Sequence, residues 1–150
     1  MKSRTAFKDQ QLGFFFNINN LQVTPGEDIP ESQYSAAEAV NTKAYELIQK
    51  LLPQAGVWRK QDENEPEITY SPYEVCEETW ETEELEGKIA FSFWIFSHHP
   101  IDQATMSAFQ VEVATAYELA AAELGGNVQF LRIESVVKEE IVTRTVIGTA

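Results

Sequence analysis

Cysteine and basic residues are scarce in this chain. Its 150 residues include one cysteine, Cys76, so no disulfide can form within a single chain. Lysine and arginine total 11 against 24 aspartates and glutamates, and the formal net charge is −13. Phosphate contacts need Lys and Arg, so we expect no direct binding to nucleic acid, and an anionic membrane surface would repel the chain. The expected partner is a basic protein surface or another copy of the chain.

Long apolar runs are also missing. The longest, residues 89–96, has the length of a strand, whereas a membrane helix needs about 20 apolar residues. The N-terminal segment carries basic residues but no apolar run of signal-peptide length before Asp9. We therefore expect a cytoplasmic protein. Hydrophobic residues make up 43% of the sequence, enough at this length for one domain over residues 1–150 without a metal or disulfide.

Recognisable catalytic and cofactor motifs are absent from the sequence. Its glycines form no phosphate-binding loop, dinucleotide fingerprint or nucleophile elbow. Cys76 lies among glutamates, whose charges oppose thiolate formation. His98 and His99 are adjacent, and neighbours in an extended chain point opposite ways, so together they make a poor metal site. We expect no catalytic residue, metal or cofactor. The alternative is a small enzyme or ligand binder that uses the His98–His99 loop, because strand-to-helix loops often carry sites.

Strand patterns stand out against these absences. Residues 13–19 alternate, with Phe14, Phe16 and Ile18 on one face, which predicts a half-buried strand. Residues 88–97 are apolar on both faces, which is typical of a strand in the middle of a covered sheet. Residues 128–147 are rich in β-formers and form either one long strand or two strands with a bend near 135–140.

Two helices separate these strands. Residues 36–52 have apolar side chains at helical spacing, with Ser35 and Glu38 as a predicted capping box and Pro53 beyond the end. Asp102 is the predicted N-cap of a second helix that runs to about residue 124 and closes at Gly125. The order predicts an α+β, ferredoxin-like β-α-β-β-α-β sandwich. Two helices would cover one face of a mostly antiparallel sheet, and an acidic β-hairpin would be added to it.

Acidic residues are concentrated between Gln61 and Gly87. This segment holds eleven acids and no Lys or Arg, so it carries nearly all of the charge imbalance. One interpretation is a solvated hairpin whose charges keep an edge strand from pairing wrongly. The other is a docking strip for a basic protein. Aromatic residues, which anchor interfaces, are interleaved with the acids, and positive charge on a partner would relieve their mutual repulsion.

The second interpretation gives the functional hypothesis. It describes a non-enzymatic protein–protein interaction module, of the inhibitor, immunity-protein or assembly-subunit type. The predicted partner-binding residues are the acids and aromatics of the strip: Tyr70, Tyr73, Glu74, Glu77, Glu78, Trp80, Glu81, Glu83 and Glu84. The alternative is a self-assembling structural subunit of a larger complex. In that case a sheet edge and the long C-terminal strand would pair between copies and form a homo-oligomer.

Overall fold

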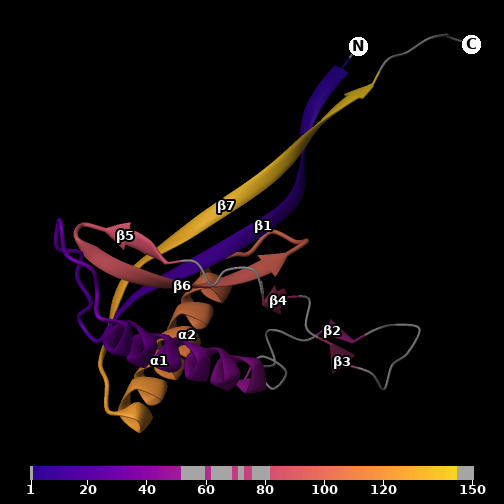
Figure 1. Cartoon of the computed structure of the whole chain (residues 1–150). Helices are drawn as coiled ribbons and strands as arrows, with labels where there is room; N and C mark the ends of the chain where they lie inside the picture. Colours follow the sequence, from indigo (N-terminus) through magenta and orange to yellow (C-terminus); the bar gives the residue numbers. More distant parts are fainter. Residues whose placement is uncertain (1, 52–59, 62–68, 71–72, 76–81, 145–150) are drawn as a thin grey trace, which may run out of the picture.

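The computed structural model describes residues 2–51, 60–61, 69–70, 73–75 and 82–144. Its long elements are strand β1 (Lys2–Ile18), helix α1 (Glu31–Leu51), strand β6 (Lys88–Ser97), helix α2 (Gln103–Leu124) and strand β7 (Val128–Arg144) (Figure 1). Short strands lie between α1 and β6: β2 (Lys60–Gln61), β3 (Thr69–Tyr70), β4 (Tyr73–Val75) and β5 (Glu83–Leu85).

The main sheet confirms the predicted ferredoxin-like architecture. Its strand order is β4-β6-β1-β7, and β5 pairs with β6 as well. Each of these pairs is antiparallel, and β1 and β6 occupy the middle of the sheet. Both helices lie on the same side of the sheet (Figure 1). Strands β2 and β3 pair with each other in a separate two-stranded sheet.

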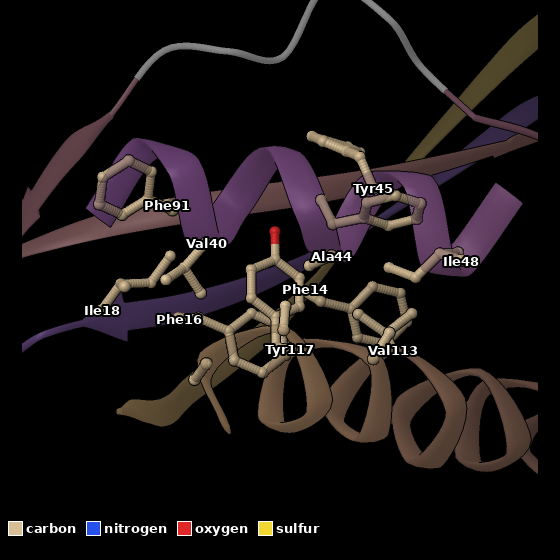
Figure 2. Close-up of a cluster of buried hydrophobic side chains, with 14 of the residues drawn as sticks. Phe14, Phe16, Ile18, Val40, Ala44, Tyr45, Ile48, Phe91, Val113 and Tyr117 are labelled. Carbon is tan, nitrogen blue, oxygen red and sulfur yellow. The ribbon is translucent and has the colours of Figure 1, made fainter. Parts of the chain in front are cut away.

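The core lies between the sheet and the two helices. Alternate residues of β1 and β6 point toward the helices and are buried there, and α2 contributes Tyr117 (Figure 2). The Tyr117 ring stacks on Phe16 with ring centroids 4.0 Å apart, and its hydroxyl donates a hydrogen bond to Asn41 Oδ1 of α1 at 2.5 Å. This bond joins the two helices inside the core. The largest fully buried side chains are Tyr117, Phe14, Phe15, Phe16, Phe93, Phe109, Leu12, Ile18, Ile48, Ile95 and Val40.

The helix ends agree with the sequence at α2 but not at the start of α1. At α2, Asp102 Oδ1 accepts from Thr105 N at 2.7 Å, which lowers the pKa of Asp102, and Gly125 closes the helix at a φ of 73°. Helix α1 begins at Glu31, so Ser35 lies within it and the predicted capping box is wrong. The carbonyl of Pro30 accepts from the amides of residues 33 and 34. The fixed φ of proline suits the start of a helix, and this favours the earlier beginning.

Strands β1 and β7 extend beyond the rest of the sheet. Each is 17 residues long, and they pair from Lys2 opposite Arg144 to Ile18 opposite Val128. The C-terminal segment is therefore one long strand. Strand β6 pairs with β1 only over residues 10–16, so residues 2–9 and 138–144 continue as two strands alone (Figure 1). We call this extension the ribbon. One register shift, between Phe7 and Asp9, interrupts its pairing.

Candidate functional site

The sheet has two outer edges, and the acidic strip borders one of them. Strand β4 pairs with β6 at residues 95–97, and β5 pairs with β6 at residues 88–90. Both short strands thus lie along the same side of β6, opposite β1. Glu83, Glu84 and Glu86 are exposed and make no ion pair within the part of the chain that the structure describes. We call β4 with β5 the acidic edge.

The structure locates only part of the predicted partner-binding set. Tyr73 and Glu74 pair with one end of β6, and Glu83 and Glu84 pair with its other end, so these four positions share an edge of the sheet but do not form one cluster. Tyr70 belongs to β3, in the separate two-stranded sheet. The other four, Glu77, Glu78, Trp80 and Glu81, lie outside the described residues. The docking strip therefore stays a prediction.

The opposite edge of the sheet is formed by β7. This strand pairs with β1 along its whole length, and within the described residues no strand pairs with its other side. Its alternate backbone N–H and C=O groups are therefore open to a further strand. Three apolar side chains of β7 are exposed to solvent: Ile133 by 37%, Val136 by 42% and Val137 by 48%. We call the open side of β7 the β7 edge.

Charged side chains of both signs alternate along β7 on the face away from the helices. Arg132 lies opposite Phe15, Glu134 opposite Gly13 and Val136 opposite Gln11. The Arg132 guanidinium sits over the Phe15 ring, 5.2 Å from its centroid, and also pairs with Glu134. Further along, the Nζ atom of Lys8 lies 3.3 Å from a carboxylate oxygen of Glu140. Positive and negative groups thus follow one another on this face.

An indole ring covers the middle of the same face. Trp94 of β6 lies across Gly13 of β1, and a Cβ atom at Gly13 would come within 2.6 Å of the ring. The Trp94 Nε1 donates to Ser92 Oγ at 3.1 Å, and its ring meets Phe15 edge-on at 5.7 Å. Glycine is required at position 13 because the indole takes the space of a side chain. This packing buries Phe15 without a second layer of helices.

The histidine loop is exposed in the structure. His98 and His99 are exposed, Ser97 Oγ donates to the His99 carbonyl at 2.8 Å, and the His98 ring meets Phe96 edge-on at 4.7 Å. Cavities of about 290, 360 and 370 Å³ lie at the loop before α1, between β5 and β7, and beside α1. Neither histidine lines any of them. The enzyme alternative therefore stays a prediction.

The described ranges lack two further features. No group of three or more His, Cys, Asp or Glu side chains there is arranged to hold a metal ion. No helix there is both long enough and apolar enough to span a membrane.

Comparison with known proteins gives only weak structural likenesses. No known protein family and no curated protein matches the sequence. A hydantoinase/carbamoylase family amidase from Burkholderia ambifaria is similar over 87% of this chain and 28% of its own, with 11% identity and a TM-score of 0.44. Amidases of that family from Burkholderia multivorans and Burkholderia vietnamiensis have 12% and 11% identity and TM-scores of 0.37. They match over 88% and 89% of this chain and 29% of theirs. The chain thus spans less than a third of these proteins, and such scores assign it no activity.

Proposed function

We propose that the chain is a non-enzymatic, self-assembling subunit that pairs the β7 edge with the β7 edge of a second copy. The observation that supports this most is the long open side of β7, which is 17 residues long and has exposed apolar side chains on both of its faces. An open strand of this kind is a template for another strand. Pairing like edges gives a two-fold dimer, the commonest symmetric oligomer.

The two edges of the sheet differ in how they are protected. Proteins guard open edges with short strands and with charge. The acidic edge has both devices, because β4 and β5 have three residues each and Glu83 and Glu84 are exposed. Strand β7 is long and carries no excess of charge of one sign, since its three basic residues balance its three acids. The β7 edge is therefore the better suited of the two to accept another strand.

The ribbon gives a second reason for a partner at β7. Two strands alone are marginally stable in water, and three or more are needed for independent stability. Residues 2–9 and 138–144 pair only with each other among the described elements. A second β7 laid along the edge would extend the sheet beside the ribbon and supply backbone hydrogen bonds that it lacks.

The oligomeric state in solution tests this proposal. We expect sedimentation equilibrium to show a dimer of twice the chain mass that dissociates on dilution. Val136→Lys should weaken the dimer, because it adds charge to the β7 edge. Val111→Lys is the matched control, since Val111 is 66% exposed on α2, away from the sheet. A monomer at every accessible concentration, or equal weakening by both substitutions, would refute the proposal.

A second candidate is docking of the acidic edge on a basic protein. It is supported by the exposure of Glu83, Glu84 and Glu86 and by their lack of ion pairs within the described residues. Such binding would weaken with salt, because exposed charges are screened. A partner retained by the chain at low salt should be released at high salt and lost by a variant with Gln at positions 83 and 84. Retention by that variant would argue against this candidate.

A further inference from the structure

We propose that two copies pair in one antiparallel register, in which Val136 lies opposite Val136 of the partner on the two-fold axis. This inference rests on the proposed function and specifies the geometry of the same edge. Arg132 would lie opposite Glu140 of the partner, and Glu134 opposite Lys138. Both pairs would occur twice by symmetry.

Backbone geometry first restricts the registers available. In a strand, the N–H and C=O groups of one residue point to one side and those of the next residue to the other. Directly opposite residues in an antiparallel pair must both point toward the partner or both point away from it. Two identical strands therefore pair only in registers that place one residue opposite its own copy. The two-fold axis then passes midway between these two copies, and each register is named by that residue.

The restriction applies to residues 132–144 because β7 is regular there. One register shift between β1 and β7 leaves Leu131 without an opposite residue, since Phe15 pairs with Arg132 and Phe16 with Phe130. The other shift leaves Lys8 of β1 unpaired, between Phe7 and Asp9, and adds no residue to β7. The strand therefore keeps one alternation from Arg132 onward.

Charge then selects one of the remaining registers. An axis through Glu134, Lys138, Glu139 or Glu140 places a charge opposite itself. An axis through Ser135 places Arg132 opposite Lys138, and one through Val137 places Glu134 opposite Glu140. Like charges directly opposite each other are destabilising, and opposite charges are stabilising. Axes through Ile133 and Val142 also avoid like pairs, but they pair only residues 132–134 or 140–144 of the regular segment. The axis through Val136 pairs residues 132–140 without a like pair, and it forms two kinds of opposite pair, each of them twice.

The ion pairs already present within one chain fit this register. Arg132 and Glu134 pair within the strand, as do Lys8 and Glu140 across the ribbon. In the dimer, Glu140 of one copy meets Arg132 of the other, which joins these separate pairs into a row of alternating sign. At the centre, two exposed valines come together, a β-branched contact that favours strand pairing.

Disulfide crosslinking tests the register directly. All variants carry Cys76→Ser, which removes the one native cysteine of the sequence. Directly opposite residues in an antiparallel pair have Cα atoms about 4.5–5.5 Å apart, within disulfide reach. Val136→Cys should therefore form a crosslinked dimer on mild oxidation. Val137→Cys should not, because in this register its partner copy lies diagonally opposite, at or beyond the limit of about 7 Å.

A charge exchange provides the second test. Lys138→Glu places a glutamate opposite Glu134 at two symmetric positions and should raise the dimer Kd about tenfold. Glu134→Lys should weaken the dimer similarly. The double variant, Glu134→Lys with Lys138→Glu, restores opposite pairs and should recover most of the lost affinity. Thermal unfolding of each variant below its dimer Kd separates these effects from changes within one chain.

The outcomes distinguish the register from the proposed function. Crosslinking at position 136 but not at 137, with recovery in the double variant, supports the register. A dimer that crosslinks at position 137, or that loses still more affinity in the double variant, overturns the register and leaves the pairing of β7 edges in place. A strict monomer overturns both.

Discussion

Strands β1 and β7 pass through two different environments in the same molecule. Between residues 10 and 16, β1 lies between β6 and β7, and Leu12, Phe14 and Phe16 are buried under the helices. In the ribbon, the same two strands pair only with each other among the described elements. The covered half is stabilised by burial, about 1.5–3 kcal/mol for each large apolar side chain. The ribbon depends on strand pairing, so its stability should change with anything that adds a strand.

The largest effect should come from the covered half. Phe16 stacks on Tyr117 and meets the Phe130 ring edge-on at 5.5 Å. Phe16→Ala should lower the free energy of unfolding by about 3–5 kcal/mol, because it removes buried surface and leaves a cavity. Urea denaturation at a fixed protein concentration measures this. A loss below about 1 kcal/mol would mean that burial of Phe16 is not what stabilises the covered half relative to the ribbon.

The ribbon should respond to protein concentration, unlike the covered half. At a concentration of about 100 times the dimer Kd, association stabilises the paired state by about 2.7 kcal/mol. Amide hydrogen exchange of residues 138–144 should therefore slow by up to about a hundredfold relative to dilute protein. Amides of β1 at residues 12–16 serve as the internal control, because β1 lies there between β6 and β7. If the amides of residues 138–144 exchanged at the same rate in dilute and in concentrated protein, association would not stabilise the ribbon, and the contrast with the covered half would fail.

A smaller effect is expected at the hydrogen bond between the helices. Tyr117→Phe should cost about 1–2 kcal/mol, because buried Asn41 Oδ1 loses its donor. Burial, and to a lesser extent the nearby Tyr45, raises the pKa of Tyr117 well above 10.0. The neutral Tyr117 hydroxyl therefore contributes fully to the free energy of unfolding below a pH of about 10, the pKa of tyrosine in the unfolded chain. This contribution declines as the pH rises further, because the hydroxyl ionises more readily in the unfolded chain than in the folded one. The free energy of unfolding of Tyr117→Phe should not show this decline at alkaline pH. Urea denaturation of both proteins at pH 8 and pH 11 measures the difference. If Tyr117→Phe lost as much stability at pH 11 as the unaltered chain, the decline would come from titratable groups other than Tyr117.

The sequence was most informative where one local signal decided the structure. Asp102 and Gly125 mark the ends of α2 because each cap is made by one residue and its immediate neighbours. The start of α1 was predicted wrongly because the prediction depended on Ser35 and Glu38 alone, whereas the helix begins at Glu31, directly after Pro30. The ferredoxin-like fold class was predictable because two β-α-β halves leave few compact arrangements, whereas the order of the strands in the sheet required the structure.

The β7 edge was harder to predict because it depends on which strands are missing. Alternation shows which face of a strand is buried but not how many strands flank it. Ile133, Val136 and Val137 were therefore not among the predicted site residues, and the β-rich segment 128–147 was compatible with one long strand or with two strands. The acids of the strip were visible in the sequence as charge, while their position along β6 required the structure.

The smallest effect should occur at the acidic edge. Glu83→Gln together with Glu84→Gln changes two exposed side chains that make no ion pair within the described residues. The free energy of unfolding should change by less than about 0.5 kcal/mol. The dimer Kd should change little, because β5 pairs with β6 and not with β7, and Arg132 forms its ion pair with Glu134 and not with Glu84, although Glu84 and Arg132 line one cavity. Urea denaturation and sedimentation measure both quantities. If the variant lost the dimer, the acidic edge would be the assembling one, and the ribbon would then need another source of support.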